Sequence, residues 1–293
     1  MRKTVLILGI LASFNANAWE ACGTDGKGNT ANCEYQIVDG TLTIRGTGEN
    51  GNIGWWRVDN YIYAYSPWAG QTFENIIIED SIKDLGYQSF YNSTCANTII
   101  IPDSVQKISG DAFKNAKISG FVLPDGITLI GGHGFSGTPI TEIEIPDTVT
   151  RIGESAFAQY LVSSANLTEI IVPDTVVSIG KGAFSGQSKL QTLTIGENTH
   201  LTEIFGSTIP QNLKIYCTGD TAKCDANLEE AGYPELKSIG ATKRKVNGMT
   251  YILDKKGNIV ASSGRRTEKR IYTIDEANLV AKPSGNTVRI KYR

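Results

Sequence analysis

Residues 145–157 read Ile-Pro-Asp-Thr-Val-Thr-Arg-Ile-Gly-Glu-Ser-Ala-Phe, and degenerate copies of this stretch recur through the middle of the 293-residue chain. The copies end on regularly spaced phenylalanines, which are Phe90, Phe113, Phe135, Phe157 and Phe184. The steps between them are 23, 22, 22 and 27 residues, and an insertion near 160–165 lengthens the last step. A fixed period of this size predicts a solenoid in which each copy forms one coil.

The residues within one copy predict the path of its coil. Ile170 and Val172 alternate as the inward positions of a short strand do. The proline that follows ends the strand and fixes a turn, where the aspartate is expected to bond its own backbone. Each closing phenylalanine is expected to stack on its neighbours, and burial of one ring contributes about 2–3 kcal/mol. Weaker copies at 76–90 and 190–215 bring the expected number of coils to six.

The run Ile-Pro-Asp-x-Val-x-x-Ile-Gly-x-x-Ala-Phe resembles the BspA-like leucine-rich repeat family of bacterial secreted and surface proteins. The resemblance covers about residues 73–216, roughly half of the chain. It implies a leucine-rich-repeat solenoid of mainly short parallel β-strands with little helix. It also implies adhesion to host proteins or other cells, and no enzymatic activity in the repeats. Gly134 replaces the usual alanine, and the sixth copy lacks Pro-Asp and Ala-Phe.

Residues 1–18 are typical of a secretory signal peptide. Arg2 and Lys3 precede the apolar run 5–12, and Asn15-Ala16-Asn17-Ala18 provides a small-residue cleavage site. The apolar run is about half of the roughly 20 residues that a membrane span requires, so no transmembrane segment is predicted. The mature chain is therefore expected to be exported: secreted, periplasmic or associated with the cell surface.

The segments outside the repeats predict a β-rich N-terminal cap and a small α+β C-terminal module. The N-terminal cap contains a hairpin around Asp39-Gly40. The module is expected to contain a short helix that begins near Thr273, and a strand with one basic face at 287–293. The full division is 1–18 signal peptide, 19–72 cap with an aromatic cluster, 73–216 repeats, 217–245 C-terminal cap and linker, and 246–293 basic module.

Five cysteines bear on the expected location, because an exported chain can form disulfides. Cys22 and Cys33 lie near one end of the mature body, and Cys217 and Cys224 lie near the other. Pairing within each couple is expected. Neither couple contains Cys-x-x-Cys or has a histidine nearby, so no metal site is predicted. Cys95 is expected to be a buried thiol that fills core space.

The strand residues that should point away from the solenoid interior predict a binding surface. The middle outward column is mostly apolar, and a contiguous file of exposed apolar residues is typical of a contact surface. The alternative is that branched residues are present for their β-propensity alone. The candidate protein-binding residues are Ile77, Ile100, Val122, Glu142, Glu144, Glu169, Ile171 and Thr194.

A second candidate surface is the aromatic cluster of the N-terminal cap. Exposed aromatic rings can stack on sugars, so a glycan site is one interpretation. The other is that the rings cover the open apolar face of the first coil. The candidate glycan-binding residues are Trp55, Trp56, Tyr61, Tyr63 and Trp68.

Composition excludes other classes of function. The net charge is −2, which excludes a bulk polycation built for nucleic acid. Charge is nonetheless uneven: 243–293 has 13 basic and 4 acidic residues, whereas 19–242 has 13 basic and 26 acidic residues. The basic tail is expected to attach to an anionic envelope polymer, to lean on the acidic body near Glu142, Glu144 and Glu169, or simply to be a solvated charged surface.

No catalytic residue, metal or cofactor is predicted. The chain has two histidines, and the aspartate column supplies too few oxygens for the six to eight ligands of calcium. The sequence therefore predicts a non-enzymatic binding protein for adhesion or protein–protein recognition, with a host or cell-surface protein as partner. The alternative is binding of a glycan or cell-wall polymer through the aromatic cap and the basic module.

Overall fold

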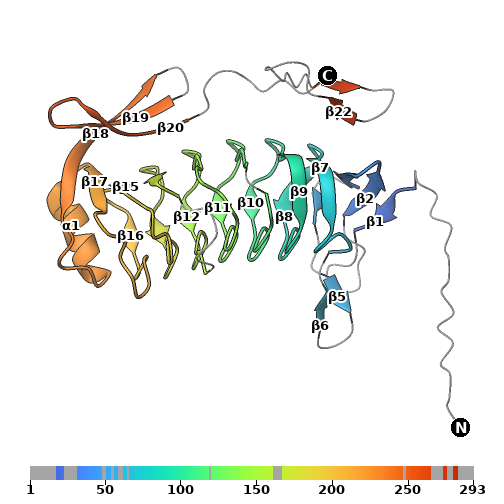
Figure 1. Cartoon of the computed structure of the whole chain (residues 1–293), viewed down its shortest axis with the longest axis horizontal. Helices are drawn as coiled ribbons and strands as arrows, with labels where there is room; N and C mark the ends of the chain where they lie inside the picture. The colour runs from blue at the N-terminus through green and yellow to red at the C-terminus, as the bar shows by residue number, and fades with distance from the viewer. Residues whose placement is uncertain are drawn as a thin grey trace, which may run out of the picture.

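Successive coils stack along one axis, from an N-terminal cap to a short helix at the other end (Figure 1). The stacking confirms the predicted solenoid, because each coil contributes parallel strands that pair with the next coil. This computed structural model describes residues 18–22, 32–47, 51–53, 56–58, 62–64, 66–118, 120–160, 167–246, 249–264, 273–275 and 280–282.

One side of the solenoid, which we call the strand face, is built from the segments that precede each Pro-Asp turn. Its N-terminal sheet has the order β1-β2-β3-β7-β9, with bounds Glu20–Ala21, Cys33–Val38, Thr41–Gly46, Thr72–Ile78 and Thr94–Ile100. Its C-terminal sheet has the order β13-β15-β17-β18-β19-β20, with bounds Glu169–Ile171, Thr192–Gly196, Lys214–Thr218, Ser238–Val246, Met249–Asp254 and Ile259–Gly264. Segments 121–123 and 143–145 hold the corresponding positions between the two sheets without forming regular strands.

A second sheet runs along another side of the coils in the order β16-β14-β12-β11-β10-β8-β4. The isoleucine of each Ile-Gly pair is in register with those of neighbouring coils, as in Ile130 opposite Ile152. A Cβ added to Gly153 would lie 2.5 Å from the amide nitrogen of Gly132, so the coils approach too closely there for a side chain. In chain order the strands β4, β8, β10, β11, β12, β14 and β16 span Gly51–Asn52, Ile82–Leu85, Lys107–Ile108, Leu129–Ile130, Arg151–Ile152, Ser178–Ile179 and His200–Leu201.

The core contains a continuous stack of aromatic rings. Phe113 and Phe135 are parallel within 9°, with ring centroids 5.3 Å apart, and Phe157 continues the stack 5.6 Å further on. Offset stacking at these separations is the arrangement that aromatic pairs prefer. All these rings are fully buried. The complete stack is Trp68, Phe90, Phe113, Phe135, Phe157, Phe184, Phe205 and Tyr233.

The N-terminal hairpin β2–β3 and the C-terminal helix cover the two ends of the aromatic stack. Hairpin β2–β3 turns at Asp39-Gly40, and its Tyr35 ring packs edge-on against Trp68 at 5.0 Å. At the other end α1 spans Thr221–Glu230 and begins at Asp220, whose carboxylate accepts a hydrogen bond from the amide of Ala222. Both predicted disulfides, Cys22–Cys33 and Cys217–Cys224, are present. Cys95 is buried, and its thiol donates to the carbonyl oxygen of Glu74.

The chain after α1 differs from the predicted linker and separate module. Strand β18 pairs in parallel with β17 and then continues through 243–245, the expected linker, to pair with β19. Strands β18, β19 and β20, which we call the basic hairpin, fold back along the solenoid from its C-terminal end (Figure 1). The expected helix near Thr273 is wrong, because β21 at Thr273–Asp275 pairs with β22 at Val280–Lys282. Strands β5 at Trp56–Val58 and β6 at Ile62–Ala64 form a further pair.

Candidate protein-binding surface

The outward column of the strand face follows the predicted register. Ile77 lies opposite Ile100 across β7 and β9, and Ile171 lies opposite Thr194 across β13 and β15. Inward neighbours such as Ile76 and Ile170 are fully buried in the core. The alternation inferred from the sequence therefore holds, and it places the candidate residues on the side away from the core.

The N-terminal half of this column is open. Val122 exposes 58% of its surface, Ile77 and Ile100 are half-buried, and Glu142 is exposed. Glu144 is half-buried, and it lines the same cavity as Lys243 and Lys245 of β18, where the covered half of the face begins. We call Ile77, Ile100 and Val122 together the open apolar column.

The C-terminal half of the column is covered, so the expected exposure of Ile171 and Thr194 is wrong. Ile171 exposes 5% of its surface and Thr194 exposes 1%. Ile171 packs with Tyr216 of the next coils and with Ile252 and Ala261 of the basic hairpin. The residues do point outward, but the hairpin lies on top of them and removes them from water.

Glu169, another candidate binding residue, is also engaged by the hairpin. Its Oε1 accepts a hydrogen bond of 2.6 Å from the backbone amide of Ser262 in β20. Burial raises the pKa of the Glu169 carboxyl, and the Ser262 amide offsets only part of this rise. Glu169 therefore fixes the hairpin rather than presenting a charge to a partner.

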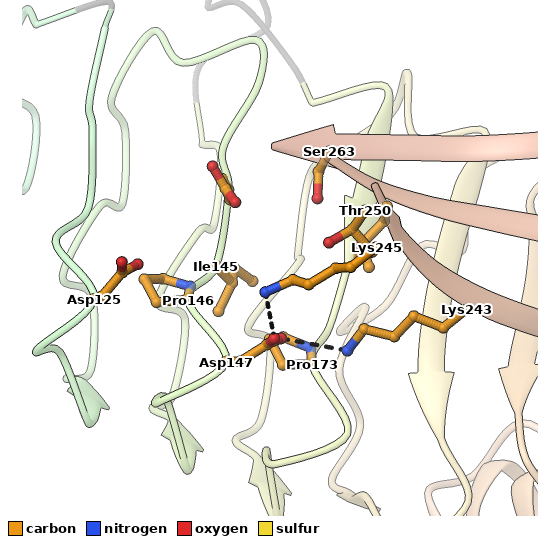
Figure 2. Close-up of a pocket in the computed structure, with 11 residues that line it drawn as sticks. Asp125, Ile145, Pro146, Asp147, Pro173, Lys243, Lys245, Thr250 and Ser263 are labelled. Atoms are coloured by element: carbon orange, nitrogen blue, oxygen red, sulfur yellow. Dashed lines mark hydrogen bonds and ion pairs between the residues drawn. The ribbon is translucent and has the colours of Figure 1, made fainter. Parts of the chain in front are cut away.

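Two lysines of β18 attach the hairpin to the turns of the solenoid (Figure 2). Lys245 Nζ lies 2.6 Å from Asp147 Oδ2, and Lys243 Nζ lies 3.3 Å from Asp147 Oδ1. Lys243 Nζ also lies 3.7 Å from Asp174 Oδ2. The hydrogen bond to Asp147 raises the pKa of Lys245. The prediction that the basic segment leans on the acidic body therefore holds for the hairpin, although its contacts are the turn aspartates as well as Glu169.

The turn acids form a file along the edge of the strand face, one in each coil. The register between β7 and β9, continued past Ile77 and Ile100, places Asp80 beside Asp103. The period of the repeat places an acidic residue at the same position in each following coil. The residue after the aspartate links the turn to the preceding coil. In one such turn, the Thr148 hydroxyl donates a hydrogen bond to the carbonyl oxygen of Ile127. The carboxylate of Asp147 bonds lysines instead of its own turn. We call this file the acidic ladder, and its members are Asp80, Asp103, Asp125, Asp147, Asp174 and Glu197.

The attachment of the hairpin is expected to depend on the ionisation of Asp147. Partial burial opposes ionisation of this carboxyl, but the hydrogen bonds and charges of Lys245 and Lys243 outweigh burial and lower its pKa. A lowered pKa stabilises the docked state above the ordinary aspartate value near 3.9, and the stabilisation is lost as the pH falls through the folded value. Asp147→Asn should therefore cost about 0.5–1 kcal/mol at pH 7 and less at pH 3.

Hydrogen exchange of β19 and β20 amides measures that difference directly. Because Glu169 has a raised pKa, the wild-type profile contains an opposing contribution at acidic pH. The matched control Asp39→Asn alters a turn far from the hairpin and should leave the exchange unchanged. An equal effect of Asp147→Asn at both pH values would contradict the ion-pair account.

Trp68 is the one member of the candidate glycan-binding set whose side chain the structure describes. Trp68 is fully buried in the ring stack, and its indole nitrogen donates to the carbonyl of Ser89 at 2.6 Å. Trp68 is therefore a capping residue, and its assignment as a glycan-binding residue is wrong. Trp55 and Tyr61 lie outside the described residues, and for Trp56 and Tyr63 only the strand backbone is described. The glycan interpretation stays a prediction for these four.

Among the described residues, no three His, Cys, Asp or Glu side chains gather closely enough to hold a metal ion. No helix in the same segments has the length and hydrophobicity that crossing a bilayer requires.

Comparisons with known proteins identify the repeats. The family model described as "BspA type Leucine rich repeat region" matches six copies over residues 61–164 and 158–215, which is more than half of the chain. No curated protein matches the chain.

Solved structures with similar coils include a leucine-rich repeat protein from Bacteroides ovatus, 18% identical, with 65% of this chain and 70% of that chain covered and a TM-score of 0.27. A leucine rich cell surface protein from Faecalibacterium prausnitzii is 19% identical, with 70% and 77% covered and a TM-score of 0.24. The T. pallidum Leucine Rich Repeat protein is 15% identical, with 74% and 97% covered and a TM-score of 0.27.

Proposed function

Because the chain belongs to the BspA-type leucine-rich repeat family, we propose that it is a non-enzymatic protein that binds another protein through the open half of its strand face. The observation that supports this most is the open apolar column beside the exposed Glu142. Val122 at its centre exposes 58% of its surface although the adjacent Phe121 and Leu123 are buried. A contiguous apolar file rimmed by charge is typical of a contact surface.

The small size of the open face sets the strength of binding. Coils repeat at about 4.8 Å, and three strand residues span about 10 Å, so the open face offers a few hundred Å². A stable interface buries about 800 Å² on each partner. Binding by one copy is therefore weak, and useful affinity requires flanking loops or several copies of the chain held together.

The location that fits this role is outside the cytoplasm. The signal-peptide pattern of 1–18 and the two disulfides favour an exported chain. In that setting the partner is a host or cell-surface protein, and the role is adhesion or recognition at the cell envelope.

Replacing Ile100 and Val122 together by lysine tests this proposal. The double variant should bind at least about tenfold more weakly to purified extracellular and cell-surface proteins that retain the wild-type chain, because the lysines add charge where apolar contact is needed. The melting temperature should stay close to that of the wild type. Binding is measured by surface plasmon resonance on immobilised proteins, with a glycan array run in parallel.

The matched control is Tyr160→Lys with Val177→Lys, since these two side chains are 59% and 60% exposed and lie off the strand face. This control should bind as the wild type does. Undiminished binding by the Ile100 and Val122 variant, or binding to glycans alone, would reject the strand face as the site.

A further inference from the structure

The basic hairpin shows what the strand face accepts. Its inner side makes two kinds of contact, one on each column of the solenoid. Ile252 and Ala261 pack on Ile171 and Tyr216 of the outward column. Lys243 and Lys245, on the neighbouring strand, bond the acidic ladder at Asp147. The occupied half of the face is therefore recognised by aliphatic side chains that alternate with lysines on an extended chain.

The same two columns continue into the open half of the face. The open apolar column takes the place of Ile171, and Asp80 and Asp103 take the place of Asp147. Both aspartates are exposed. In the part of the chain that the structure describes, neither Asp80 nor Asp103 forms an ion pair. The open half thus has the apolar and anionic features that the hairpin satisfies further along.

The direction of β18 gives the spacing that a second occupant needs. Lys243 contacts Asp174 and Asp147, whereas Lys245 contacts Asp147 and is also acted on by the charge of Asp125, so β18 advances along the ladder toward the N-terminal coils. Alternate residues of a strand are about 6.7 Å apart, whereas neighbouring coils are about 4.8 Å apart. Asp80 and Asp103 therefore lie about 5 Å apart, which two alternate cationic side chains cover.

We propose that the open half binds an extended segment of a partner protein that alternates lysine or arginine with aliphatic side chains. This inference rests on the function proposed above and names the class of partner for the same face. Cations on the segment bond the turn aspartates, while the aliphatic side chains cover Val122 and Ile100. A simple polyamine satisfies only the first of these contacts and leaves the apolar column in water.

A synthetic peptide, Lys-Val-Lys-Val-Lys-Val-Lys, is the probe, titrated into the full chain by isothermal calorimetry. Two peptides serve as comparisons, one with serine for each valine and one with glutamate for each lysine. The first peptide should bind at least about tenfold more tightly than either comparison. Raising the salt concentration should weaken its binding, because the turn aspartates are exposed and screened by ions.

The decisive variant is Asp80→Lys with Asp103→Lys, which reverses two charges of the open ladder. It should weaken the peptide at least about tenfold. The matched control Glu229→Lys with Glu230→Lys makes the same change of net charge on exposed positions of α1, away from the face, and should bind as the wild type does. Circular dichroism melting establishes that both variants are folded.

Three results would overturn this partner class: equal affinity for the serine peptide, no loss in the Asp80 and Asp103 variant, or a loss in Asp147→Asn alone, which would mean that the peptide displaces the hairpin. The proposed function fails separately. If Ile100→Lys with Val122→Lys abolishes binding to a protein while Asp80→Lys with Asp103→Lys does not, the face binds proteins of another chemistry.

Discussion

Phe135→Ala is expected to lower the free energy of unfolding by about 3–5 kcal/mol. The Phe135 ring is fully buried between Phe113 and Phe157, and Phe121 packs against its edge at 4.9 Å. Removing it leaves a cavity inside the stack and deprives two coils of their shared contact. Because a solenoid coil is stabilised mainly by its neighbours, the loss also reduces the coupling between the two halves of the array. Urea denaturation followed by circular dichroism gives the value.

Tyr160→Ala is the control for that experiment. Tyr160 is 59% exposed, so its removal should change stability by no more than about 0.5 kcal/mol. Phe205→Ala provides a comparison at the end of the stack, because Phe205 is its last phenylalanine and packs on Tyr233 of the cap. If Phe135→Ala costs less than about 1 kcal/mol, the ring stack is not what holds the coils together.

Ile171→Lys is expected to release the basic hairpin from the solenoid. Burial of the Ile171 side chain contributes about 2–3 kcal/mol, and an ammonium group cannot remain in the same apolar contact with Ile252 and Ala261. The least costly response is for the hairpin to leave while the coils stay folded. Trypsin should then cleave β18 at Lys243, Arg244 or Lys245 at least about tenfold faster than in the wild type.

The same substitution in the open half provides the contrast. Ile100 occupies the corresponding outward position but is not covered by the hairpin, so Ile100→Lys should leave the cleavage rate within about twofold of the wild type. Equal cleavage rates in Ile100→Lys and Ile171→Lys would mean that the hairpin is held by its ion pairs alone.

Local pattern was sufficient to predict the coils. Each layer repeats the same residues at the same spacing, so the strand register and the stack through Phe113 and Phe135 follow from periodicity, while the resemblance to the family rests on the motif itself. The disulfides were predictable because Cys217 and Cys224 are close in sequence as well as in space. The long step before Phe184 did not disturb the stack, since Phe157 and Phe184 remain 6.0 Å apart.

The covered half of the site was beyond prediction from the repeats. Ile171 is buried by Ile252, which is distant in sequence and belongs to no repeat. The run Lys243-Arg244-Lys245 ends the segment 217–245 that the sequence predicts as C-terminal cap and linker. In β18, however, Lys243 and Lys245 share one side and Arg244 points to the other, so alternation was the signal. The charge imbalance between body and tail indicated an attachment but not its location.

The lysine partners of Asp147 were beyond prediction for a related reason. An aspartate after proline is so commonly a turn residue that its own backbone was the expected partner. The register of neighbouring coils places these carboxylates side by side. The cation that bonds Asp147 is Lys245, which comes from a distant part of the chain. Trp68 is a similar case, because its burial depends on contacts with Ser89 and Tyr35, which are distant from it in the sequence.

The placement of sulfur in the fold determines how the protein behaves toward redox chemistry. Four of the five cysteines are tied in two bridges, and the thiol of Cys95 is 7% exposed. Attack on a foreign disulfide requires an accessible thiolate, which this chain does not present. Copies can therefore be crowded in an oxidising medium without becoming covalently linked, and any clustering that raises their avidity must come from reversible contacts.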